Sequence, residues 1–254
     1  MAFGLVGVGT LVGLGVRSTL GGDGGDAAAT STAPAATAIA PRVAAAATPS
    51  TTGAPATTTP SIDTPGSPWW IVNRDRPLPA GYVPSDLVTP DVPLKPDTGA
   101  TQLTAATAAA FEAMVSEAAN AGYRLQLNSG YRSEEQQQML YDRYVQDFGQ
   151  EVADQRVALP GTSEHQTGLA GDVGLVGLPD DQLFGDTEAS VWVAANAHRF
   201  GFVLRYPPDK AEITGYTNEP WHLRYVGVEL ATALQESGLT MEEYFGLVPT
   251  TTTS

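Results

Sequence analysis

The chain is predicted to fold as an α+β domain, a small antiparallel sheet flanked by helices, preceded by a disordered tether. Three observations lead to this prediction. Helical and strand-like patterns are interleaved from residue 69 onward without the period of repeated βαβ units. Asp26–Pro65 is almost entirely Ala, Thr, Pro, Ser and Gly, which cannot bury enough apolar surface to fold. The remainder of the 254 residues is long enough for one large domain.

Composition divides the chain into four segments. They are a hydrophobic signal or membrane-anchor segment at residues 1–22, a linker at 23–66, the folded domain at 67–248 and a polar tail at 249–254. The apolar stretch Ala2–Val16 is short for a bilayer span and lacks the basic start of a signal peptide, so we expect the natural start to lie upstream. A cleaved signal, an uncleaved anchor and a flexible glycine-rich tail all stay open. A tether directly behind an apolar segment favours an exported domain held at the cell surface.

The domain is predicted to begin with an extended arm. Trp69–Val72 should be a short strand, and the prolines after it predict extended chain that wraps the domain. Thr101–Asn120 is alanine-rich with apolar residues near helical spacing, which predicts a helix that ends at Gly122. Tyr123–Asn128 alternates with a period of two and should be a strand.

A capping box predicts the next helix. Ser133 is followed three residues later by Gln136, so a helix should run from about Glu134 to Phe148. Arg132 then lies between strand and helix, beside the positive end of the helix dipole, where anions bind readily. An arginine paired with a surface carboxylate is the simpler interpretation unless this junction faces a functional site.

The same signals predict the second half of the domain. The expected helices are Glu151–Leu159, Glu188–Phe200, Val228–Ser237 and a short capped turn beginning at Thr240. The expected strands are Leu169–Val176, Phe202–Tyr206 and Glu219–Val226.

Charge and cysteine content exclude several functions. The chain has 28 Asp and Glu against 13 Lys and Arg, a net charge of −15, and no visible basic patch. A nucleic-acid partner is not expected, because phosphate binding depends on clustered positive charge. There is no cysteine, which excludes disulfides, thiolate metal ligands and cysteine nucleophiles.

Two short motifs contain residue types that bind metal ions. SEHQTGLAGD carries His165 and Asp172, and EPWHLRY carries Glu219 and His222. Zinc in hydrolytic sites takes three nitrogen or oxygen ligands and keeps a fourth position for water. Two histidines and an aspartate could supply the ligands, with the glutamate acting as base. The glycines of the first motif and Gly174 behind it are expected to keep side-chain bulk away from the ion and the substrate.

Each histidine taken singly could instead be a satisfied core residue. Of the three in the chain, His198 lies late in a predicted helix with no other ligand type nearby, and we expect it to be structural. The other two stand in motifs with carboxylates, which favours a metal site. There is no H-E-x-x-H motif, so a thermolysin-like arrangement is excluded. The spacing alone favours a zinc hydrolase.

Four motifs resemble those of VanY-type D-alanyl-D-alanine carboxypeptidases, which are zinc-dependent peptidoglycan peptidases. They occur in the family's order between about Trp69 and Leu247. The motifs are Ser129–Ser133 (SGYRS), Ser163–Asp172, Gly201–Pro207 and Glu219–Gly227. The arm VNRDRPLP is similar to the family's domain start.

The resemblance implies a Zn²⁺ site in a cleft on the sheet. His165, Asp172 and His222 match the zinc ligands, and Glu219 matches the catalytic base. Arg132 matches the arginine that steadies the substrate and the developing oxyanion.

The resemblance also implies a substrate. Gln137 and Ser163 match positions that help hold the terminal carboxylate of a peptide. The expected activity is removal of the C-terminal D-alanine from peptidoglycan stem peptides, by a monomer outside the cytoplasm that is secreted or membrane-anchored. Three alternatives stay open: an L,D-carboxypeptidase, a stem-peptide endopeptidase with the same zinc site, and a noncatalytic wall-binding module.

Overall fold

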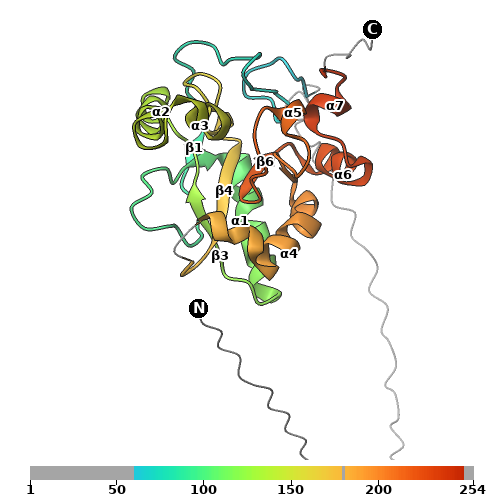
Figure 1. The fold of residues 1–254 in the computed structure, drawn as a ribbon. Coiled ribbons are helices and arrows are strands. Elements are labelled where there is room, and N and C mark those ends of the chain that lie inside the picture. Colours follow the sequence, from blue (N-terminus) through green and yellow to red (C-terminus); the bar gives the residue numbers. More distant parts are fainter. Residues whose placement is uncertain (1–59, 179–180, 249–254) are drawn as a thin grey trace, which may run out of the picture. The chain divides into compact units, whose positions relative to one another are not determined.

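The computed structural model describes residues 60–178 and 181–248, all within one compact unit, Pro55–Ser254 (Figure 1). Its centre is an antiparallel sheet with strand order β3-β4-β6-β5. The strands are β3 (Leu125–Ser129), β4 (Ala170–Leu175), β5 (Phe202–Leu204) and β6 (His222–Tyr225). A separate pair contains β1 (Leu87–Val88) and β2 (Leu103–Thr104).

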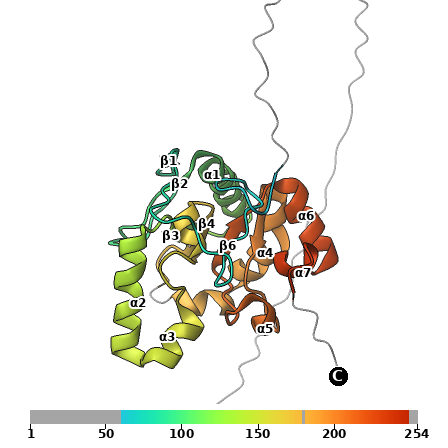
Figure 2. The ribbon, with the colours of Figure 1, turned by 90° about the horizontal axis from the view of Figure 1, so that it is seen from above.

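Helices pack around this sheet, as Figures 1 and 2 show. The α-helices are α1 (Ala105–Asn120), α2 (Glu134–Phe148), α3 (Gln150–Arg156), α4 (Glu188–Asn196), α5 (Ala211–Thr214), α6 (Val228–Ser237) and α7 (Met241–Tyr244). The 3-10 helices are η1 (Glu164–Thr167), η2 (Asp181–Asp186) and η3 (Ala197–Phe200). The predicted mixture of helices and a small antiparallel sheet is confirmed.

The main core lies between α1 and the sheet. Phe111 and Met114 of α1 are fully buried in one cluster with Leu125 and Leu127 of β3. The Phe111 ring meets that of Phe202 on β5 edge-on, with centroids 6.0 Å apart. Burying each such side chain contributes about 1.5 to 3 kcal/mol, so this helix holds the sheet that carries the candidate site.

Both predicted capping boxes are present. Ser133 accepts from the Gln136 backbone N–H at the start of α2, and the Gln136 side chain accepts from the Ser133 N–H. Thr240 and Glu243 make the same pair of bonds at α7. These reciprocal bonds satisfy amide groups that the first helical turn leaves unpaired.

Trp69–Val72 was predicted to be a strand, which is wrong for this part of the described chain. Its last three residues are buried, but its backbone groups bond elsewhere: the Ile71 N–H donates to Ile62 O, and the Arg224 guanidinium donates to Trp70 O. The hydrogen bonds that a neighbouring strand would make are therefore made by a loop and by an arginine side chain. Because Ile62 packs with this segment, the packed chain begins before the predicted boundary at 66.

Several other predicted elements have different ends; among them, the helix expected over Glu151–Leu159 is α3, which ends at Arg156, and the strand expected over Phe202–Tyr206 is β5, which ends at Leu204. The helix expected from residue 101 is α1 and begins only at Ala105, because the two residues before it form strand β2, which pairs with β1. The helix expected over 188–200 is α4 followed by η3. The strand expected from Glu219 begins at His222, whose N–H donates to Glu219 O and so forms a turn.

The glycines near β4 make room for the core, not for a metal ion, so that expectation was wrong. A Cβ on Gly171 would lie 3.1 Å from the Leu127 side chain, and one on Gly174 would lie 2.2 Å from the Asn128 amide. Gly168 has a φ of +67°, which favours glycine at the end of η1.

The hydrophobic start, most of the linker and the polar tail lie outside the described residues. Across residues 60–178 and 181–248, no helix has both the length and the apolar character needed to cross a bilayer.

Candidate metal centre

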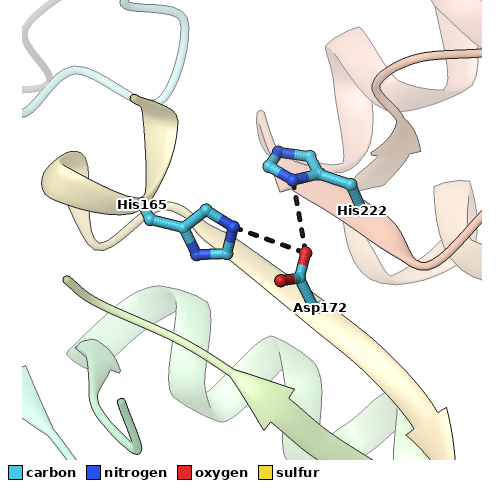
Figure 3. Close-up of side chains that lie close together, drawn as sticks. All are labelled: His165, Asp172 and His222. Atoms are coloured by element: carbon cyan, nitrogen blue, oxygen red, sulfur yellow. Dashed lines mark ion pairs between the residues drawn. The ribbon is translucent and has the colours of Figure 1, made fainter. Parts of the chain in front are cut away.

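Antiparallel pairing of β4 with β6 builds the centre of the site. Asp172 on β4 lies directly opposite His222, the first residue of β6. His165 comes from η1, immediately before β4. The three side chains converge (Figure 3), and one ligand atom from each lies within 4.8 Å of the others. Residues from two distant motifs thus meet as one group.

The geometry of this group fits a shared cation. Asp172 Oδ1 lies 3.4 Å from His165 Nε2 and 3.3 Å from His222 Nδ1. This oxygen is buried, yet it has no partner with hydrogen-bond geometry among the residues described. A buried oxygen without a hydrogen-bond partner destabilises the fold, and a bound cation would supply that partner. Two imidazoles and one carboxylate around a common point are a typical zinc ligand set.

Each imidazole is held by the nitrogen that faces away from the centre. His165 Nδ1 lies 2.7 Å from Gly130 O, which requires the proton on Nδ1 and leaves the Nε2 lone pair free. His222 Nε2 lies 3.3 Å from Glu164 Oε2, so a proton there leaves Nδ1 free. Metal-binding histidines are typically oriented in this way.

Electrostatics in the metal-free chain already favour a positive charge at the centre. Burial opposes ionisation of Asp172, but His165 and His222 outweigh it and hold the pKa of this carboxyl well below its usual range. Burial likewise opposes protonation of His222, but Asp172 and Glu164 raise its pKa to about 9. A metal cation would take the place of that proton.

Glu219 lies beside the group without belonging to it. It precedes β6, and its Oε2 lies 3.8 Å from His222 Nδ1. Burial, together with the negative charge of Asp172, raises the pKa of Glu219 to about 7, although His222 and Arg132 act in the opposite direction. A carboxyl with this pKa can both accept and release a proton near neutral pH.

The raised pKa of Glu219 leads to a prediction for the metal-free protein. Its folded-state pKa is about 7 against 4.5 for an ordinary glutamate, so the stability it contributes is complete below pH 4.5 and is lost as pH rises through 7. Glu219→Gln should therefore raise the free energy of unfolding by about 2 to 3 kcal/mol near pH 8 and much less near pH 4. Urea unfolding of both proteins in the presence of a chelator measures the free energy of unfolding at each pH. An equal increase at about pH 8 and at about pH 4 would contradict the raised pKa.

A cavity of about 820 Å³ opens in front of the group. All seven residues assigned from the sequence line it: Arg132, Gln137, Ser163, His165, Asp172, Glu219 and His222. Side chains of α2 and α3 form another part of the wall, and Figure 2 shows these two helices on the side of the sheet away from α6 and α7. His198, expected to be structural, lies in η3 and is not part of the metal-binding group.

Arg132 lines the cavity and interacts electrostatically with the acidic side chains of the site. Burial lowers the pKa of Arg132, whereas Asp172 and Glu219 act against this shift. Its Nε is buried and finds no hydrogen-bond partner within the described part of the chain. An unsatisfied donor beside a cavity is suited to binding a negatively charged oxygen.

Gln137 makes one side-chain hydrogen bond within the domain. Its Nε2 donates to Ala158 O at 2.8 Å, which leaves the buried Oε1 without a partner in residues 60–178 and 181–248. This oxygen can accept a hydrogen bond, and the second hydrogen of Nε2 can still be donated to a carboxylate. Ser163 is 3 % exposed and offers a hydroxyl that can do either.

Sequence reasoning missed Glu164, which is fully buried next to His222. Its other partners, Arg205 and Arg224, lie far along the chain, so no local spacing indicates their contact.

A family model described as VanY, D-alanyl-D-alanine carboxypeptidase, matches residues 100–228. The chain belongs to the VanY family. It is 42% identical over 189 residues to the putative carboxypeptidase YodJ of Bacillus subtilis (strain 168), covering 73% of this chain and 69% of that one. It is 38% identical to a D-alanyl-D-alanine carboxypeptidase of Enterococcus faecalis (strain ATCC 700802 / V583), covering 68% and 64%.

Two solved structures share the fold. The LdcB LD-carboxypeptidase has a TM-score of 0.67 and 42% identity, with 72% of this chain and 88% of that chain covered. A variant of the vancomycin resistance D,D-pentapeptidase VanY in complex with Zn(II) has a TM-score of 0.60 and 38% identity, with 69% and 97% covered. The family resemblance read from the four motifs is confirmed.

Proposed function

We propose that the chain is a zinc-dependent carboxypeptidase that removes the C-terminal D-alanine from peptidoglycan stem peptides. The observation that supports it most is the convergence of His165, Asp172 and His222 on one point. The Glu219 carboxyl lies beside this group in the cavity without belonging to it. Membership of the VanY family supports it. One related structure is a complex with Zn(II), and a second related structure is a complex with D-alanine-D-alanine.

The residues then have distinct roles. A zinc ion held by the three ligands would polarise the scissile carbonyl and lower the pKa of a water molecule. Glu219 takes the proton from the attacking water and later gives it to the amine of the departing D-alanine. Arg132 stabilises the negative charge that develops on the carbonyl oxygen.

The remaining polar residues would position the peptide. The Ser163 hydroxyl can donate to the terminal carboxylate, as the family resemblance implies. Gln137 lines the cavity and uses one Nε2 hydrogen for Ala158 O, so its second Nε2 hydrogen would help hold the same carboxylate.

Arg132→Gln should lower kcat/KM for D-alanine release by about 10²-fold or more, because it removes a charged donor from the developing oxyanion. Arg124→Gln is the matched control, since Arg124 is exposed and does not line the cavity. Steady-state kinetics of both variants test this role, with zinc content measured in parallel. Equal activity of the two variants would remove Arg132 from the mechanism.

A second candidate, L,D-carboxypeptidase activity, is favoured by the similarity to LdcB. Both activities are tested by incubating the zinc-loaded protein separately with pentapeptide and tetrapeptide stems and determining the masses of the products by mass spectrometry. Loss of one D-alanine from the pentapeptide supports the primary proposal. Loss from the tetrapeptide alone supports the second candidate, and internal fragments indicate an endopeptidase. If the zinc-bound protein leaves both peptides uncleaved, the result supports a noncatalytic wall-binding module.

We further propose that residues 67–248 act outside the cytoplasm, since the expected substrate is part of the cell wall. Residues 1–22 would direct or anchor the chain, and residues 23–66 would let the domain reach its substrate. Fractionation of cells that express the chain with and without residues 1–22 tests this. Identical cytoplasmic retention of both would contradict it.

A further inference from the structure

Glu164 occupies an unusual position next to the metal-binding group. Its side chain is fully buried, and Oε2 lies 3.3 Å from His222 Nε2. Its other oxygen, Oε1, accepts from Arg205 Nε at 2.9 Å and from Arg224 Nη1 at 2.8 Å. A carboxylate buried this completely keeps its charge only because cations surround it.

Both arginines extend the contact to distant parts of the chain. Arg205 makes a bidentate pair with Glu242 of α7, with N–O distances of 2.9 and 2.5 Å. Arg224 Nη2 donates to Trp70 O at 2.6 Å and to Pro68 O at 3.2 Å, in the N-terminal arm.

The arm and α7 are also linked directly, because Asn73 Nδ2 donates to Glu242 Oε1 at 3.2 Å. The network of Glu164, Arg205, Arg224 and Glu242 contains two carboxylates and two guanidiniums, all nearly inaccessible to solvent. Such a balanced set is sensitive to the removal of any member, because the partner left behind is a buried charge without compensation.

We propose that Glu164 is a positioning residue for the metal site, and that Arg205, Arg224 and Glu242 make its position depend on the docked arm and α7. Glu164 holds the proton of His222 on Nε2, so that Nδ1 faces Asp172 and His165. A ring free to turn would offer the wrong nitrogen to the ion. Both end segments of the domain therefore contribute to metal affinity without contacting the ion.

This inference rests on the proposed zinc site, but it makes no use of peptide specificity. A purely structural network would affect stability alone. The distinguishing readouts are zinc affinity in folded protein and the state of the His222 ring.

Glu242→Gln is the main test, because it alters the network three contacts away from His222, through Arg205 and Glu164, while preserving the shape of the side chain. Glu243→Gln is the matched control: it lies next to Glu242 on α7 but pairs with Lys210 and caps the helix. Zinc affinity is measured by competition with a chromophoric chelator at a temperature where circular dichroism shows both variants folded. NMR of the zinc-loaded protein follows the His222 Nε2–H proton.

We expect Glu242→Gln to weaken zinc affinity by about 10-fold and Glu164→Gln by about 10- to 100-fold, both with an upfield shift of the Nε2–H proton. Glu243→Gln should change affinity by less than about 2-fold. Asn73→Ala, which loosens Glu242 without leaving a buried charge, provides the same test should Glu242→Gln not fold.

Unchanged zinc affinity and an unshifted Nε2–H proton in folded Glu242→Gln or Asn73→Ala would overturn the proposal. Absence of zinc binding by the unmodified protein would overturn both this inference and the proposed function. Absence of peptide hydrolysis with zinc bound would refute the proposed function alone.

Discussion

Replacing Glu219 by glutamine is expected to lower kcat for D-alanine release by about 10²- to 10⁴-fold while zinc stays bound. The amide has the size of the carboxyl but cannot take a proton from water. Glu219 is not needed for the metal, because His165, Asp172 and His222 already provide three converging ligand atoms. Release of D-alanine by a coupled assay and zinc content by elemental analysis measure the two properties separately.

A matched control is Glu212→Gln, which changes an exposed glutamate on α5 outside the cavity. It should leave both properties unchanged. Full activity of Glu219→Gln would reject the role of base, and loss of zinc from it would show that Glu219 is a ligand.

Replacing Asp172 by alanine should remove zinc binding and activity together. Asp172 supplies the only carboxylate oxygen of the three-residue metal group found among the described residues, and it lies close to a ring nitrogen of each histidine. Loss of a residue that merely orients a ligand commonly costs 10- to 100-fold in affinity, so loss of a ligand should cost more than about 100-fold. Chelator competition measures this affinity.

Asp186→Ala is the control for that experiment, because Asp186 lines the same cavity without belonging to the metal group. Its zinc affinity should match that of the unmodified protein. Equal affinities of Asp172→Ala and the unmodified protein would place the ion elsewhere.

Elements with local causes were predictable from the sequence. The capping boxes at Ser133 and Thr240 satisfy amides within the same helical turn, so α2 and α7 begin where the pattern predicts. Trp69–Val72 has strand composition but bonds to Ile62 and to the Arg224 side chain, which no local pattern encodes. The glycines near β4 were misread because their neighbours, such as Leu127, come from another strand.

The candidate site could be predicted as residue types, and its convergence depended on the family resemblance. Spacing alone could not show that β4 and β6 pair with Asp172 opposite His222. Glu164 was missed although it stands next to His165, because its significance comes from Arg205 and Arg224. Buried charge networks form between distant residues, and their members resemble surface residues in the sequence.

A crystal structure of the zinc-loaded protein, with anomalous data collected at the zinc edge, tests the central claim most directly. We expect one peak at roughly 2.0 to 2.2 Å from His165 Nε2, the Asp172 carboxylate and His222 Nδ1, with Glu219 nearby but not coordinated. A peak away from these three side chains, or one that includes Glu219 as a ligand, would contradict the account.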